Sequence, residues 1–317
     1  NVISISISIL QGGYKMKIAL DIGHNCVHDY GSRAIGNEDE MAMDTGKKVI
    51  SGLSEAGFEV LLVTPNWAQS TFHSLQQRVY KANSWSADFY LSIHFNAGGG
   101  SGSEVWTGST AGRTAALNIL TKLEELGYKN RGAKQQGVEG KGLYVLKYTK
   151  MPAILVEGCF TDSREDMNLY DAEKMADAIC KGMEITFMEK AINKDFQKKL
   201  NLLGLKDFEG KPLVDDGIFG ECTKEAVMNF QKTMALDMDG VLGPSTRFAL
   251  EQIISRPLCS MYSKYLYAVR YIQFKIGMHI NGIFGADTFQ AVLNFQKSAG
   301  IEADGIVGKV TWTHIIN

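Results

Sequence analysis

The chain has 317 residues, of which 45% are hydrophobic and 21% are charged, and its formal net charge at neutral pH is -2. This length is enough for two or three domains, and the composition is that of an ordinary globular protein. A net charge so near zero argues against nucleic acid or an anionic membrane as the main partner, because both normally require a basic patch. No sequence feature indicates the oligomeric state.

The first 15 residues are set apart from the predicted fold. The run NVISISISIL alternates like a strand, has no basic region before it and is too short to span a bilayer, so neither a signal peptide nor membrane insertion is expected. Met16 stands directly before the first predicted strand. Residues 1–15 are therefore interpreted as an N-terminal extension or a segment added for expression.

Residues 16–188 show the pattern of an α/β domain. Four short runs, KIALDI, FEVLLV, DFYLSI and AILV, are rich in Ile, Leu and Val, as are strands covered on both faces in a parallel sheet. Between the first two runs, apolar residues recur at three- and four-residue steps from Glu38 until Gly57 supplies a stop. The predicted helices cover 38–57, 70–83, 108–126 and 163–190. This succession predicts a mostly parallel, twisted sheet flanked by helices.

Three polar residues follow directly where predicted buried strands end. His24 comes after the first run, His94 after DFYLSI and Glu157 after AILV. Glu38 opens the first predicted helix. In such sheets the carboxyl ends of the strands form the binding crevice, so these side chains are expected to meet in one cleft. Two histidines and two carboxylates make a set that is fit for a zinc hydrolase.

Some neighbouring residues have a structural interpretation beside a functional one. Asp21 is either an orienting partner of a zinc-binding histidine or simply a strand-end residue, and both interpretations stay open. Cys26 and Cys159 lie close enough to the predicted site to be a nucleophile or a ligand, but small buried hydrophobic residues are the favoured interpretation.

The last part of the chain is an internal repeat. DGIFGECTKEAVMNFQKTMALDMDGVLGPST, from Asp216, aligns without gaps with NGIFGADTFQAVLNFQKSAGIEADGIVGKVT, from Asn281. DFQKKL and YIQFKI are interpreted as the first helix of each copy. The repeat predicts two small all-α modules, at residues 189–255 and 256–317, each of a size that can fold alone but only marginally.

Both parts of the chain resemble known families. LDIGHN, GNEDE, SIHFNA and LVEGCF resemble the pattern of the zinc-dependent N-acetylmuramoyl-L-alanine amidases of the type 3 family, over about residues 16–188. The D-G-x-F-G, F-Q-K and D-G-x-x-G signatures of the repeats resemble the peptidoglycan-binding type 1 module. The two resemblances imply one partner, bacterial peptidoglycan. The NRGAK segment and the lack of a signal peptide are similar to phage endolysins of Gram-positive hosts.

The amidase resemblance implies cleavage of the amide between N-acetylmuramic acid and the first L-alanine of the stem peptide. It implies one Zn²⁺ in the catalytic domain, bound by His24, Glu38 and His94. Glu157 would be the general base. Glu40 is a rival ligand, but Glu38 is preferred because it keeps the family's distance to the end of the helix.

Two further residues are candidates for binding the substrate. Asn96 lies two residues after the second histidine and is a possible hydrogen-bond partner of the substrate. Arg131, with Lys134, is a candidate for meeting a stem-peptide carboxylate, but a solvated loop is the favoured interpretation of both residues.

Two other functions stay open at this point. A zinc peptidase acting within the stem peptide would use similar chemistry, and a non-catalytic wall-binding protein would keep only a relic of the metal site. The five cysteines are odd in number and scattered, which favours free thiols made in a reducing cytosol. The protein is expected to be made in the cytoplasm and to act on the cell wall after release, with a host-secreted autolysin as the alternative.

Overall fold

The computed structural model describes residues 15–137 and 142–316. The chain divides into two compact units between Ala191 and Ile192. The predicted extension at residues 1–15 lies outside the described residues, except for Lys15. The predicted module boundaries, after residues 188 and 255, stay predictions.

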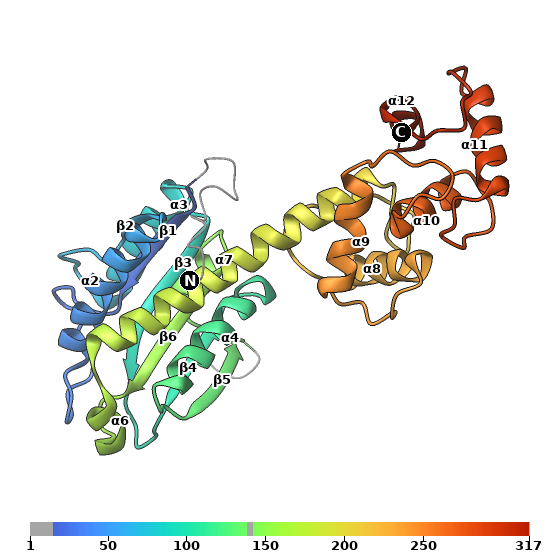
Figure 1. The fold of residues 1–317 in the computed structure, drawn as a ribbon. Coiled ribbons are helices and arrows are strands. Elements are labelled where there is room, and N and C mark those ends of the chain that lie inside the picture. The colour runs from blue at the N-terminus through green and yellow to red at the C-terminus, as the bar shows by residue number, and fades with distance from the viewer. Residues whose placement is uncertain (1–14, 138–141, 317) are drawn as a thin grey trace. The chain divides into compact units, whose positions relative to one another are not determined.

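The first unit is built on one six-stranded sheet (Figure 1). Its strands are β1 (Lys17–Ile22), β2 (Glu59–Leu62), β3 (Phe89–Asn96), β4 (Ser103–Thr107), β5 (Asn130–Gln135) and β6 (Ala153–Phe160). They lie in the order β2-β1-β3-β6-β4-β5 across the sheet. All neighbours pair in parallel except β4 and β6, which are antiparallel. The predicted mostly parallel sheet is therefore confirmed.

One end of each of the six strands lies along the same rim of the sheet, which we call the carboxyl edge. The carboxyl ends of β2, β1, β3 and β6 lie there, together with the amino ends of β4 and β5, which run the other way. His94 of β3 lies in register with Glu157 of β6. Glu104, near the start of β4, lies in register with Glu157 on the other side. Polar residues of three neighbouring strands are thus placed side by side.

Helices cover both faces of the sheet (Figure 1). The helices are α2 (Glu38–Glu55), α3 (Thr71–Ser84), α4 (Thr110–Glu125), α5 (Tyr144–Tyr148), α6 (Arg164–Leu169) and α7 (Ala172–Leu202). Ile18 and Leu20 pack into the core formed with α2, α4 and α7, whereas Ala19 packs into the core formed with α3 and α5. Because side chains alternate along a strand, His94 and Glu157 point to the α3/α5 face.

The helix predicted over residues 163–190 is instead two helices, α6 and α7. Tyr170 adopts an extended conformation, and the carboxylate of Asp171 then accepts hydrogen bonds from backbone N–H groups in the first turn of α7. Helix α7 continues to Leu202 because neither glycine nor proline occurs between Gly182 and Gly204. Among the described residues, no helix is both long and apolar enough to cross a bilayer.

The second unit is all-α, as predicted, and both copies of the repeat contribute to one core. It contains the last turns of α7 with α8 (Glu221–Met234), α9 (Pro244–Ile254), α10 (Leu266–Lys275), α11 (Ala286–Ser298) and α12 (Lys309–Ile316). Buried residues from Phe196 in the first copy to Trp312 in the second form a single cluster. The buried hydroxyl of Tyr271 donates to the backbone oxygen of Leu203 at 2.9 Å, which also joins the copies. The copies therefore share a core.

A buried glutamine recurs in each half of each copy. The four are Gln197, Gln231, Gln273 and Gln296. In each case the Nε2 group donates to an Asp or Asn of the loop that follows its helix, to a loop carbonyl and to a threonine hydroxyl, while Oε1 accepts from a loop glycine. The repeat is thus fourfold, although the sequence analysis found only two copies.

Candidate metal centre and active site

Two histidines and a glutamate form a compact cluster at the carboxyl edge. His24, Glu38 and His94 each offer one atom that could bind a metal, and these three atoms lie within 4.8 Å of one another. Oε1 of Glu38 is 3.3 Å from Nε2 of His24 and 3.2 Å from Nδ1 of His94. The structure thus brings together the three predicted ligands. The rival, Glu40, lies outside the cluster and accepts a hydrogen bond from the side chain of Asn37.

Local backbone geometry directs His24 into the cluster. His24 and Asn25 both have positive φ values, 53° and 52°. The Asn25 amide holds this turn by donating to the backbone oxygens of Gly23 and Asp39, each at 2.9 Å. A Cβ atom on Gly23 would lie 2.5 Å from Cε1 of His94, so glycine is needed for the two histidines to approach each other.

Glu38 is held in place by backbone donors. It is the first residue of α2, whose N-cap is Asn37. Its Oε1 accepts from the N–H of Phe95 at 3.2 Å, and its Oε2 accepts from the N–H of Ser32 at 2.8 Å. The helix terminus favours a negative charge at this position. Glu38 is therefore a fixed, ionised carboxylate that faces both imidazole rings.

Behind His24 lies a buried network that the sequence analysis did not predict. Oδ1 of Asp29 is 3.1 Å from Nδ1 of His24. Arg78, which is 1% exposed, donates to the backbone oxygen of His24 and to the carboxylates of Asp29 and Asp21. Asp29 stands five residues after His24, and that spacing was the only available signal.

Asp21 makes no hydrogen bond with His24 or His94, all three of which are described residues. Its carboxylate accepts hydrogen bonds from Arg78 and, at 2.8 Å, from the hydroxyls of Tyr90 and Ser92. The residue that directly orients a histidine is therefore Asp29 and not Asp21. Asp21 acts one step further away, because it anchors the guanidinium that supports Asp29.

The charges in the cluster favour a bound cation. Burial lowers the pKa of His24, but its hydrogen bonds with Asp29 and Glu38 outweigh burial and raise the pKa to about 10. Burial raises the pKa of Glu38, but the neighbouring His24 and His94 hold this pKa well below its usual range. The raised pKa of His24 shows that its carboxylate neighbours stabilise a positive charge there, and the lowered pKa of Glu38 keeps its carboxylate ionised. Two imidazole nitrogens and a carboxylate oxygen form a donor set that suits zinc.

Glu157 is a half-buried carboxyl group beside this cluster. Its Oε2 atom is buried and has no hydrogen-bond partner among the described residues. Burial raises the pKa of Glu157 to about 7, with Glu38 and Glu104 adding to the rise and His94 opposing it. A carboxyl group that titrates near neutral pH with one oxygen unpaired can act as a general base and acid.

The two predicted substrate-binding residues, Asn96 and Arg131, both contact Glu104. Nε of Arg131 and Nζ of Lys134 lie 2.8 and 2.6 Å from Oε2 of this buried glutamate. Nδ2 of Asn96 is 3.3 Å from its Oε1. The solvated-loop interpretation of Arg131 and Lys134 is wrong, because both residues lie in β5. Their contact with a substrate stays a prediction, as does that of Asn96.

Burial supports the structural interpretation of the two cysteines near the site. Cys26 and Cys159 are both buried, and burial raises the pKa of the Cys159 thiol. A thiol with a raised pKa is a poor nucleophile and a poor metal ligand. All five cysteines are unpaired.

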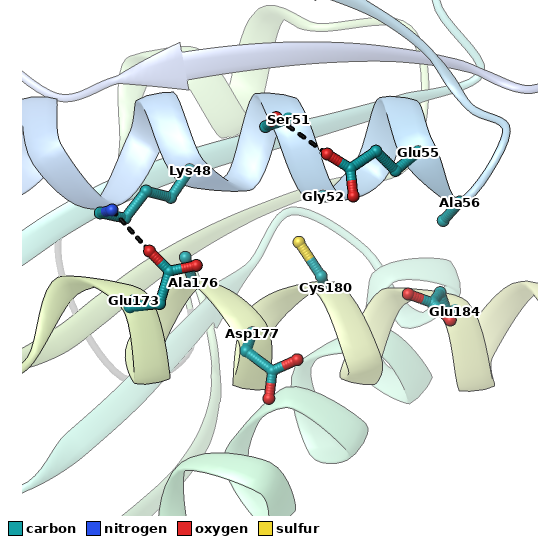
Figure 2. A pocket seen from close by; sticks show the side chains of 10 residues that line it. All are labelled: Lys48, Ser51, Gly52, Glu55, Ala56, Glu173, Ala176, Asp177, Cys180 and Glu184. Carbon is teal, nitrogen blue, oxygen red and sulfur yellow. Dashed lines mark hydrogen bonds and ion pairs between the residues drawn. The ribbon is translucent and has the colours of Figure 1, made fainter.

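A separate hollow of about 500 Å³ lies between α2 and α7 (Figure 2). Both helices line it with acidic side chains, one of which, Glu173, pairs with Lys48 at 2.5 Å. Cys180 of α7 faces Gly52 of α2, where a Cβ atom would lie 2.8 Å from the sulfur. This hollow lies on the α2/α7 face of the sheet and is therefore separate from the cluster of His24, Glu38 and His94.

An α/β sheet that holds two histidines and a carboxylate at its carboxyl edge, beside a glutamate with a raised pKa, could hold a metal ion and support hydrolysis. The chain belongs to the N-acetylmuramoyl-L-alanine amidase family, whose model matches residues 18–185. A second model, described as a peptidoglycan binding domain, matches residues 193–250 and 260–315. The family resemblance seen in the sequence is thereby confirmed.

Individual proteins are similar to parts of this chain. The N-acetylmuramoyl-L-alanine amidase LytC of Bacillus subtilis (strain 168) is 37% identical over 170 residues, which are 52% of this chain and 32% of LytC. The endolysin of Bacillus phage SPP1 is 30% identical over 174 residues, which are 51% of this chain and 61% of the endolysin. The chain thus spans less than two thirds of either relative.

Among solved structures, the CwlD amidase from Clostridioides difficile, in complex with the GerS lipoprotein, shares the fold of the first unit. The two align with a TM-score of 0.50 at 21% identity, over 55% of this chain and 99% of the CwlD chain. At this identity the similarity concerns the fold alone.

Proposed function

We propose that the protein hydrolyses the amide between N-acetylmuramic acid and the first L-alanine of the peptidoglycan stem peptide. The observation that carries this proposal is the position of Glu157, which lies in register with His94 and has a buried, unpaired oxygen beside the cluster. The family match and the name of the similar amidase support the choice of bond.

We further propose one zinc ion in the first unit. Nε2 of His24, Nδ1 of His94 and Oε1 of Glu38 would hold it, because these atoms already face one another. When bound, zinc lowers the pKa of water toward about 7 and polarises a carbonyl group. The Asp29 carboxylate would keep a proton on Nδ1 of His24, which leaves the Nε2 lone pair free for the metal.

Glu157 would move the proton. Its carboxylate accepts a proton from the attacking water and then delivers it to the nitrogen of the departing L-alanine. A pKa of about 7 suits both steps, because the group is substantially ionised at neutral pH and still gives up its proton readily. Asn96 and Arg131 are proposed to contact the substrate next to this base, Arg131 through guanidinium N–H groups that Glu104 does not use.

The repeats are proposed to bind the cell wall. The second unit matches a peptidoglycan binding domain twice. Tethering two such copies to the first unit would raise the effective concentration of the hydrolase at an insoluble substrate. Two observations thus point to one polymer, since the first unit matches an amidase of the same material. We also propose that the protein is made in a reducing compartment, which its five unpaired cysteines support.

The test measures release of amino groups from purified peptidoglycan by the parent protein and by Glu157→Ala, each with and without a chelator. We expect new L-alanine amino termini, lost on chelation and in the variant, while the variant retains its zinc. A different new terminus would favour a peptidase acting within the stem peptide. No release from folded, zinc-loaded protein would favour a wall-binding role.

A further inference from the structure

We propose that a hollow near the loop that carries His24 binds a sugar ring of the glycan strand, a role that rests on the proposed function. The hollow has a volume of about 360 Å³ and lies where the chain leaves β2 and meets α3. Trp67 and Tyr80 supply aromatic rings to its lining, and Asn66, Gln77 and Lys81 supply polar groups.

Both aromatic side chains are unusually open to solvent. Trp67 is 52% exposed and Tyr80 is 74% exposed. Covering a large aromatic ring is favourable, so two open rings in one hollow mark a surface that a ligand completes. The C–H face of a pyranose ring is apolar and flat enough to pack against an aromatic face. A sugar is therefore one of the few polar ligands that would cover these rings.

A sugar also needs hydrogen bonds, and the hollow offers them. Gln77 uses its Nε2 group on the backbone oxygen of Trp67 and on His73, and within the described part of the chain its Oε1 has no partner. Lys81 donates to the backbone oxygen of Leu62 at 2.6 Å and has further N–H groups. Hydroxyl and acetamido groups both donate and accept. A purely apolar ligand would instead leave these polar groups without hydrogen-bond partners.

The hollow is joined to the loop that carries His24. Val27 pairs with Trp67 in a parallel bridge, and Nδ1 of His28 is 2.9 Å from the backbone oxygen of Ala68. Val27 follows His24 by three residues, so the backbones of Trp67 and His24 lie within about 15 Å of each other. This places the hollow a few sugar rings from the bond proposed to be cut.

The charge of the lining favours glycan over stem peptide. The substrate extends from the proposed scissile bond in two directions, and only the stem peptide carries carboxylates. On the far side of Glu157, the β4–β5 wall is ionic, with Arg131 and Lys134 paired to Glu104. The hollow contains one charged residue, Lys81, which already donates to a backbone oxygen. The neutral glycan therefore fits the hollow, and the stem peptide fits the opposite wall.

Indole N–H signals in the NMR spectrum of the full chain provide a test that needs no turnover. The chain has four tryptophans, Trp67, Trp85, Trp106 and Trp312. Trp67→Phe identifies the signal of Trp67. We expect tri-N-acetylchitotriose to shift this signal in a saturable way, and Tyr80→Ala to weaken that binding. Because this readout needs no hydrolysis, it separates failure of the sugar site from failure of the proposed amidase.

Three outcomes of this titration would overturn the proposal. The first is no shift of the Trp67 signal at millimolar sugar. The second is a shift at Trp106 with Trp67 unchanged, which would move the glycan to the β4–β5 wall. The third is an equal shift of Trp67 with the dipeptide L-alanyl-D-isoglutamine alone, which would make the hollow a peptide subsite.

Kinetics supply an independent measurement. We expect Trp67→Ala to raise the apparent KM for polymeric peptidoglycan about three- to tenfold, with kcat little changed. Hydrolysis of N-acetylmuramoyl-dipeptide, which lacks the neighbouring sugars, should be unchanged. Phe72→Ala is the matched control, because Phe72 lies on the same helix as Tyr80 and is 57% exposed but does not line the hollow. An equal rise in KM for both variants would refute the assignment.

Discussion

The environment of Glu157 differs strongly from that of an ordinary surface carboxylate. Its pKa rises from 4.5 to about 7, so the folded protein holds this proton more tightly than the unfolded chain does. Raising the pH from 4.5 to 7 therefore removes stability. Above pH 7 the ionised group costs up to about 3 kcal/mol.

Replacing Glu157 by glutamine removes this titration and keeps the side-chain shape. We therefore expect metal-free Glu157→Gln to gain stability relative to the metal-free parent between pH 4.5 and about pH 8, while losing hydrolytic activity. Thermal unfolding of both proteins at the two pH values measures the gain. The same stability difference at both pH values would show that Glu157 does not titrate in this range.

The choice of carboxylate ligand can be tested directly. We expect Glu38→Ala to lose most of its bound zinc, because Glu38 is the carboxylate that faces both histidines. Glu40→Ala is the matched control, two residues away in the same helix turn, and should keep its zinc. Metal content after dialysis distinguishes the two. Zinc retained by the first variant and lost by the second would reverse the assignment.

The polar residues that follow the apolar runs could be predicted from the sequence, whereas their supporting residues could not. Two of the strands run further than predicted, since His94 lies inside β3 and Glu157 lies inside β6. His24, His94 and Glu157 interrupt or end apolar runs, and a parallel sheet brings such positions together. Arg78 lies within a helix, and nothing local distinguishes it from a surface arginine. Its buried contacts arise only when α3 packs on the sheet, as do those of Glu104 when β4 pairs with β6.

At the scale of elements, apolar patterning predicted β1, β2, β3 and β6 and missed β5, which lies at one edge of the sheet. β1, β3 and β6 are almost entirely buried and have continuous apolar sequences. Strand β5, with the sequence NRGAKQ, has no buried residue and no apolar alternation. It is a strand because β4 offers it a hydrogen-bonding partner, and that partner is not visible in the local sequence.

The contribution of the recurring glutamine to stability is the feature of the second unit that is easiest to test. Gln296 makes four hydrogen bonds, with Asp304, Ile306, Thr311 and Gly305, at distances from 2.8 to 3.1 Å. Leucine in its place would leave these groups unpaired. We therefore expect Gln296→Leu to destabilise the second unit by about 2–4 kcal/mol, as measured by chemical unfolding.

An exposed glutamine on the same helix serves as the control. Gln290 is exposed, and within the described ranges its side chain hydrogen-bonds with Asn294 alone, so Gln290→Leu should change stability by less than about 0.5 kcal/mol. A similar loss in both variants would show that leucine disturbs α11 itself and that the loop hydrogen bonds contribute little.

At the scale of the whole molecule, the two units should separate by function. A chain that ends at Ala191 keeps the described sheet, the metal cluster and Glu157. We expect it to hydrolyse soluble muropeptide at close to the parent rate and to lose sedimentation with purified cell walls. Unchanged sedimentation would count against wall binding by the repeats.

Cutting between the two copies of the repeat should have a different effect. Ending the chain at Ser255 would open the shared core and leave the Leu203 oxygen without the Tyr271 hydroxyl. We expect the remaining copy to lose at least about 3 kcal/mol and to be digested by protease, while hydrolysis of soluble muropeptide persists. A protease-resistant, cooperatively unfolding first copy would show that the copies fold independently.

The glutamine-closed loops make the second unit extendable by small increments. Each glutamine pairs the polar groups of its own loop with the start of the next helix, so this turn is closed within one half of a copy. A few polar contacts between segments remain, such as the backbone pairing of Cys259 with Val307 and the bond from Tyr271 to Leu203. Duplication or loss of a helix and its loop therefore leaves the glutamine-closed turns intact, and only these few contacts and the shared apolar core have to be rebuilt.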